Sequence, residues 1–182
     1  MTVTPEPGDY ACVPVGGLAG PLISIGEWLN GSAFGRYDHA YVYVGNPPGR
    51  PEARWGYKVQ AEPGGAQIRT LNSQADVDMG ALWSTGKITL TPAQRDAIVR
   101  AAMSYIGTPY SFLDYFALAA HRLRLHPLDN ILKARIASTK TLICSQLVDR
   151  AFADAGVHLF AGRWEGYCTP ADLAALIPGG HP

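Results

Sequence analysis

The residue best suited to covalent chemistry in this chain is Cys144, which stands at the head of the segment CSQLVDRAFADAG. Apolar residues recur after it at three- and four-residue spacing, which predicts a helix from Cys144 to a stop at Gly156. A thiol in the first turn of a helix lies near the positive end of the helix dipole and near unpaired backbone N–H groups. Both favour the thiolate over the thiol, so Cys144 is a candidate nucleophile.

A cysteine nucleophile needs a base, and the candidate is His39, directly before the apolar strand-like run 40–44. A cysteine–histidine hydrolase also needs a polar side chain that holds the imidazole in one tautomer and orientation. Alternation along the predicted strand 56–62 puts Gln60 and Glu62 on one face, so either could hold the ring. A carboxylate would stabilise an imidazolium, whereas an amide would mainly orient the ring.

Each candidate also has a structural interpretation. Free cysteine is among the most buried residue types, and the helix pattern places Cys144 on its apolar face. A histidine at the head of an apolar strand is commonly a core residue bonded to a carbonyl. Gln60 and Glu62 could equally be solvent-facing strand residues. Taken singly, Cys144 and His39 favour packing, and only their combination favours catalysis.

The elements that would position these residues predict an α+β fold, because strands are concentrated before residue 90 and helices after residue 91. Thr91 is the expected N-cap of one helix, with Pro92 at N1 and Gln94 at N3 as in a capping box. The predicted strands are 10–15, 40–44, 56–62, 66–71 and 82–90. The predicted helices are 18–29, 92 to a stop at Gly107, 111–125, the Cys144 helix, and 170–176 capped by Thr169.

Composition limits the function classes. A chain of 182 residues with 47% hydrophobic residues is expected to form one domain over 1–182. Fifteen basic and fifteen acidic residues give a net charge of zero, which disfavours nucleic acid and anionic membranes as partners. Cys12 and Cys168, the other two cysteines, are expected to be structural. The spacing of cysteines and histidines predicts no metal site and no cofactor.

The N-terminal residues MTVTPEPGDY have neither the basic nor the apolar region of a signal peptide, and no apolar stretch reaches the roughly 18 residues of a membrane span. The expected compartment is therefore the cytoplasm. Delivery with a phage particle, or export without a cleaved signal, stays open as an alternative.

Four blocks, in this order, resemble the circularly permuted branch of the NlpC-type papain-like cysteine hydrolases, which includes YiiX-like proteins. They are Gly8-Asp9 before the first strand, Asp38-His39-Ala40, the segment VQAEPGGAQIRTL, and ICSQLV at the start of a helix. Gly107 to Tyr110 also resembles the Gly-x-Pro-Tyr turn of that family. In the permuted branch the histidine precedes the cysteine, and here His39 likewise comes about a hundred residues before Cys144.

The resemblance implies a small antiparallel sheet packed against helices, with Cys144 as nucleophile and His39 as base. The family often has an acidic residue two or three positions before its Pro-Gly-Gly turn. That position aligns with Gln60 here, while the acid falls at Glu62, so the alignment favours Gln60 as the third member. Family geometry also implies that the Tyr110 hydroxyl reaches the substrate cleft and that a backbone N–H at Cys144 contributes to an oxyanion hole.

The expected function is a cysteine peptidase or amidase that cleaves a cell-wall (peptidoglycan) peptide or a related amide through an acyl-thioenzyme intermediate. Two alternatives stay open. One is an acyltransferase resembling lecithin retinol acyltransferase, which would pass the acyl group of a lipid to an amine or hydroxyl. The other is a catalytically silent binding or assembly module, because substrate does not follow from fold.

Overall fold

The computed structural model describes residues 4–14, 37–72, 81–110, 141–163 and 168–178. Within these ranges the chain forms five strands and three helices. The helices predicted at 18–29 and 111–125 lie outside the described residues, so both stay predictions.

The five strands form one antiparallel sheet in the order β4-β3-β2-β1-β5. Gly64 in the tight turn between β3 and β4 and Gly65 at the start of β4 both have a positive φ. Together with the helices that pack on this sheet, the arrangement confirms the predicted α+β class. The strands are β1 (Tyr10–Val13), β2 (His39–Gly45), β3 (Tyr57–Glu62), β4 (Gly65–Thr70) and β5 (Leu82–Trp83).

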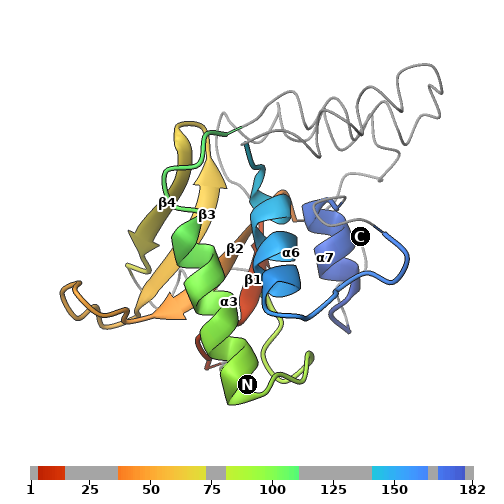
Figure 1. Cartoon of the computed structure of the whole chain (residues 1–182), viewed down its shortest axis with the longest axis horizontal. Helices are drawn as coiled ribbons and strands as arrows, with labels where there is room; N and C mark the ends of the chain where they lie inside the picture. Colours follow the sequence, from red (N-terminus) through yellow and green to blue (C-terminus); the bar gives the residue numbers. More distant parts are fainter. Residues whose placement is uncertain (1–3, 15–36, 73–80, 111–140, 164–167, 179–182) are drawn as a thin grey trace.

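Three helices cover one face of the sheet (Figure 1). They are α3 (Pro92–Ser104), α6 (Cys144–Asp154) and α7 (Pro170–Ala175). The predicted capping box at Thr91 is present, because its hydroxyl accepts from the N–H of Gln94 and the Gln94 side chain accepts from the N–H of Thr91. Thr169 caps α7 in the same way. These local signals fix where α3 and α7 begin.

The main core lies between the sheet and the helices. Alternate residues of β2 and β3, such as Val42 and Val59, pack there against apolar residues of α6, such as Leu147 and Phe152. A smaller cluster that includes Tyr41 covers the opposite face of the sheet. The period-two pattern of the strands therefore separates two sets of side chains, and the polar set of β3 lies on the face opposite the main core.

The predicted strand 82–90 is wrong beyond its first two residues. β5 ends at Trp83, and a turn follows in which the N–H groups of Lys87 and Ile88 donate to the carbonyl of Ser84. Gly86 within this turn has a φ of 68°. The apolar residues at 88 and 90 fit a strand pattern, but the turn at Ser84 ends the strand before them.

A buried carboxylate joins the start of the chain to α3. Asp9 is almost completely buried and forms an ion pair of 2.9 Å with Arg95. Its second carboxylate oxygen accepts from the Thr85 hydroxyl at 2.7 Å and from the Glu6 N–H at 2.9 Å. Because each carboxylate oxygen has a donor, burial of this charge is compensated.

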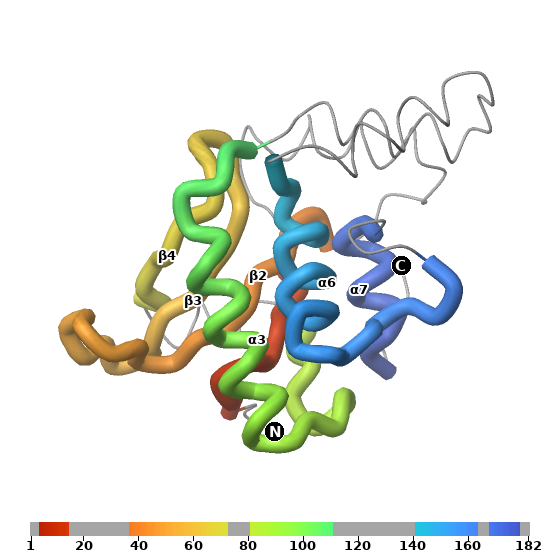
Figure 2. Tube along the Cα trace, viewed as in Figure 1, coloured from red at the N-terminus to blue at the C-terminus, as the bar shows by residue number. Residues whose placement is uncertain are grey.

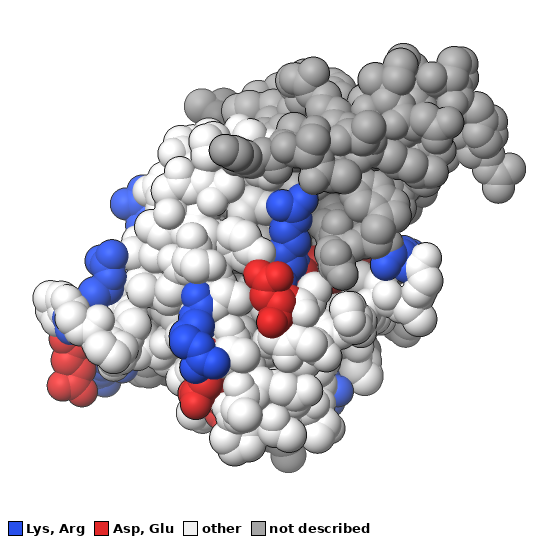
Figure 3. Space-filling view, in the orientation of Figure 1, with Lys and Arg blue, Asp and Glu red and all other residues white. Residues whose placement is uncertain are grey.

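None of the helices in the described part of the chain is long and apolar enough to cross a membrane. On the face seen in Figure 3, basic and acidic side chains lie interspersed among uncharged residues. This mixed surface agrees with the net charge of zero.

We expect Asp9→Ala to lower the free energy of unfolding by about 3 kcal/mol, because it leaves Arg95 without its buried partner. Urea unfolding at constant pH measures this. Arg163→Ala is the matched control, since Arg163 pairs with Asp172 at 3.5 Å near the surface, and its loss should cost less than about 1 kcal/mol. Equal destabilisation by both changes would contradict the role assigned to Asp9.

Candidate active site

Cys144 is the first residue of α6 and is 1% exposed. The residue before it, Ile143, is the N-cap and has no polar side chain, so it cannot cap the helix itself. Instead the Ile143 N–H donates to the Gln146 side-chain oxygen at 3.1 Å. Among the described residues, the Nε2 of this buried amide has no hydrogen-bond partner. The predicted position of Cys144 in the first helical turn is therefore correct.

His39 begins β2 and contacts both of the polar residues that a cysteine site requires. Its Nε2 lies 3.0 Å from Oε1 of Gln60 on the neighbouring strand β3. The ring also forms a side-chain hydrogen bond with Cys144. Since Nε2 faces Gln60, the nitrogen left for the thiol is Nδ1. The structure thus brings Cys144, His39 and Gln60 together in that order.

The surroundings of His39 act on its pKa in opposite directions. Burial of the ring is the largest influence and lowers the pKa. The charge of Cys144, its hydrogen bond and that of Gln60 together outweigh burial, so the net shift is upward. Lys58 opposes this as a nearby positive charge. An imidazolium stabilised by a cysteine is the electrostatic arrangement of a thiolate–imidazolium pair.

Backbone contacts hold the start of α6 against one end of the sheet. Ala66 in β4 donates to the carbonyl of Thr108 at 2.8 Å and accepts from the N–H of Gly107 at 2.8 Å. One residue further on, the carbonyl of Pro109 accepts from the N–H of Leu142 at 3.0 Å. We call residues 107–110 the strap. It connects the β3–β4 hairpin, which carries Gln60, to the segment that leads into Cys144.

Close packing at the β3–β4 turn also requires glycine. A Cβ at Gly65 would lie 2.9 Å from the carbonyl oxygen of Thr108, and Gly65 has a φ of 109°. In Figure 2 the first turns of α6 lie beside β2, and this helix packs against that strand. Gly65 in the segment EPGGA therefore allows the strap to approach the sheet.

Glu62 bonds to Gln60 and Arg69, whereas Gln60 is the residue that bonds to the imidazole of His39. Its Oε2 accepts from the Nε2 of Gln60 at 2.9 Å, and its Oε1 accepts from Arg69 at 3.1 Å. The structure therefore separates the two candidates that the sequence left open: Gln60 holds the ring, and Glu62 holds Gln60. Arg69 was missed, although alternation in a β3–β4 hairpin puts it on the same face as Glu62.

Tyr110, the predicted substrate-contacting residue, ends the strap. Its backbone forms an isolated parallel bridge with Leu142, two residues before Cys144, and its side chain packs against the main core. The residue therefore lies beside the segment leading to the thiol. Contact of its hydroxyl with substrate stays a prediction.

The two other cysteines are buried thiols that bond to backbone carbonyls. Cys12 donates to the carbonyl of Pro170 at 3.6 Å, and Cys168 donates to that of Ser145 at 3.4 Å. All three cysteines lie within the described residues, and none of them forms a disulfide. Burial, with a smaller contribution from Asp149, raises the pKa of the Cys168 thiol well above its ordinary value. Both residues fit the structural role expected of them.

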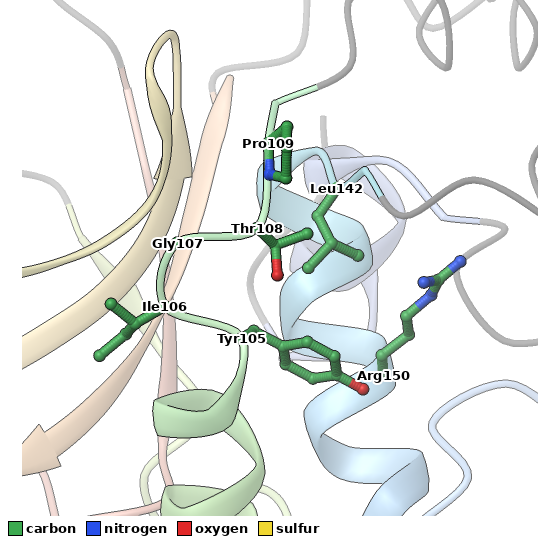
Figure 4. Close-up of a pocket in the computed structure, with 7 residues that line it drawn as sticks. All are labelled: Tyr105, Ile106, Gly107, Thr108, Pro109, Leu142 and Arg150. Atoms are coloured by element: carbon green, nitrogen blue, oxygen red, sulfur yellow. The ribbon is translucent and has the colours of Figure 1, made fainter.

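A pocket of about 370 Å³ lies between the segment 105–109, Leu142 and Arg150 of α6. Figure 4 shows Tyr105 and Arg150 approaching each other across it, while Ile106 points away. Cys144, His39 and Gln60 are not among its lining residues. The pocket therefore borders the strap without containing Cys144, His39 or Gln60. In the described part of the chain, no three His, Cys, Asp or Glu side chains gather to hold a metal ion.

Comparison with models of known protein families, with curated proteins and with solved structures found no match to this chain.

The opposing influences on His39 predict the effect of removing Cys144. In Cys144→Ala the two contributions that raise the His39 pKa through the thiol disappear, while burial and Lys58 still lower it. We therefore expect the His39 pKa to fall, as measured by an NMR titration of the imidazole. Cys12→Ala should leave this pKa in place. A His39 pKa that is the same with and without Cys144 would rule out the interaction.

Proposed function

We propose that this chain is a cysteine hydrolase of the permuted papain-like type, acting on the amide bond of a cell-wall peptide or a related amide. The observation that carries the proposal is the position of His39, whose ring is hydrogen-bonded to Gln60 on one side and to Cys144 on the other. Cys144, His39 and Gln60 thereby have the contacts that a nucleophile, a base and an orienting residue would need. The substrate class rests on the resemblance of the sequence blocks.

The reaction would proceed in two steps. His39 takes the proton of the Cys144 thiol at Nδ1, and the sulfur attacks the carbonyl carbon of the amide. The same proton then passes to the leaving nitrogen as the C–N bond breaks, which gives an acyl-thioenzyme and an amine. His39 next takes a proton from water, whose oxygen attacks the thioester, and the carboxylic acid leaves as the thiol reforms. Backbone N–H groups at the start of α6 would stabilise the oxyanion.

The contact between ring and thiol also bears on the alternatives. A catalytically silent module requires no hydrogen bond between Cys144 and His39, so the observed one favours an enzyme. An acyltransferase would use the same residues but would pass the acyl group to an amine or hydroxyl. The two enzyme classes are therefore separated by the acceptor of the acyl group and not by the reactive pair.

Alkylation with iodoacetamide provides a first test, read out for each cysteine by peptide mass spectrometry. We expect Cys144 to react faster near neutral pH than a cysteine in an unstructured peptide, because its proton can pass to His39. His39→Ala should slow the reaction at Cys144 by about tenfold or more.

Cys12 and Cys168 are internal controls in this experiment, since they are as buried as Cys144 but bond to backbone carbonyls. They should react slowly in every variant. If Cys144 reacts at the same slow rate as these two, the proposed nucleophile is wrong.

Acylation by an activated ester tests the chemistry itself. With p-nitrophenyl acetate we expect a burst of nitrophenol and an acetyl group on Cys144, and His39→Ala should slow the burst by about a hundredfold. Adding a primary amine then separates the classes, because a hydrolase releases acetate whereas an acyltransferase gives mainly the acetamide. No acetylation at Cys144 would refute both, and a panel of muropeptides and other amides would follow a positive result.

A further inference from the structure

A series of hydrogen bonds continues behind Gln60, away from His39. Gln60 donates through Nε2 to one carboxylate oxygen of Glu62, and Arg69 donates to the other oxygen. Gln60, Glu62 and Arg69 belong to one hairpin, β3 and β4 (Figure 1). The side chain of Gln60 is buried, whereas those of Glu62 and Arg69 are 29% and 55% exposed. The series thus connects the ring of His39 to the protein surface.

The ionised carboxylate of Glu62 determines how the Gln60 amide must be turned. A carboxylate only accepts hydrogen bonds, so the end of the amide that faces it must be the NH2 group. The carbonyl oxygen then faces His39. Reversing the amide would place this carbonyl against the carboxylate of Glu62 at a hydrogen-bond distance with no proton between them. Arg69 keeps the carboxylate in place through an ion pair of 3.1 Å.

The orientation of the amide in turn determines which nitrogen of His39 carries the proton. A carbonyl oxygen only accepts, so the Nε2 that faces Gln60 must donate. In the neutral ring a proton at Nε2 leaves Nδ1 with a free lone pair. That is the nitrogen available to Cys144, and only in this tautomer can it take the thiol proton.

We propose that Glu62, held by Arg69, is a positioning residue that fixes the Gln60 amide and thereby selects the His39 tautomer able to act as a base. The use of that base in catalysis rests on the proposed function. Selection of the tautomer does not, since it is a property of the unliganded protein. The surface exposure of the Glu62–Arg69 pair means that it contributes little to stability, so its loss should affect the ring and not the fold.

The decisive variant is Glu62→Gln, which keeps the shape of the side chain and removes its charge. An amide at this position can donate as well as accept, so both orientations of Gln60 become compatible with it. The tautomer of His39 is read from the 15N shifts of its ring, in a Cys144→Ser background and at a pH where the ring is neutral. We expect at least about tenfold more Nε2–H than Nδ1–H with Glu62 present, and comparable populations in Glu62→Gln.

Glu52→Gln is the matched control, because it removes the same charge from an exposed site between β2 and β3. It should leave the tautomer ratio unchanged, and thermal unfolding should be alike in all variants. An unchanged tautomer ratio in Glu62→Gln, or a native ring protonated mainly at Nδ1, would overturn the proposal.

The ester reaction links this positioning role to activity. With Cys144 present, Glu62→Gln should slow the acylation burst about threefold to thirtyfold at saturating ester, with little change in KM, as expected for an effect on a base rather than on binding. If the native chain is not acylated at all, the proposed hydrolase fails, and the tautomer measurement still decides the role of Glu62. If acylation is normal in Glu62→Gln, the positioning role fails and the hydrolase stands.

Discussion

The candidate site depends on the two backbone hydrogen bonds that join Ala66 to Gly107 and Thr108. Gln60 comes from a hairpin and Cys144 from a helix that begins more than eighty residues later, so some element must hold these two parts at a fixed distance. The strap does so, because it pairs with β4 on one side and with the segment before α6 on the other. Backbone hydrogen bonds suit this task, since their geometry does not depend on rotamers.

Electrostatics at the site are local and do not come from the overall charge. The chain has a net charge of zero, yet the pKa of the buried His39 ring is shifted by individual neighbouring groups. Burial alone would keep this ring neutral, and contact with Cys144 and Gln60 reverses that tendency. Desolvation opposes an isolated charge but strengthens a pair of opposite charges, so a partly buried ring responds strongly to the state of its neighbouring thiol.

The features that could be predicted from sequence were those fixed by local signals. The capping box at Thr91 and the helix start at Cys144 follow from residue types a few positions apart, and both were predicted correctly. The strand 82–90 failed because its apolar spacing says nothing of the turn at Ser84, which depends on pairing with Tyr10 in a distant strand. The segments 18–29 and 111–125 lie outside the described residues, so their predicted helices are untested.

The choice between Gln60 and Glu62 could not be made from alternation, because both residues occupy the same face of β3. The two residues differ in their partners on the neighbouring strands. The ring of His39 in β2 contacts Gln60, whereas the side chain of Arg69 in β4 contacts Glu62. Such contacts depend on register and rotamer, and a single sequence contains no direct signal for either. The sequence indicated that residues 107–110 form a turn motif, but it gave no sign that this segment would pair with Ala66.

The order of the elements along the chain has a consequence for biosynthesis. His39 and Gln60 are translated in the first third of the sequence and Cys144 in the last quarter. Pairing of β2 with β3 closes a short loop, whereas docking of α6 on the sheet closes a much longer one, and long-range contacts of this kind tend to form late in folding. A ribosome-bound chain therefore has His39 in place well before Cys144 is synthesised, so the proposed pair of thiol and imidazole is completed only after most of the sheet exists.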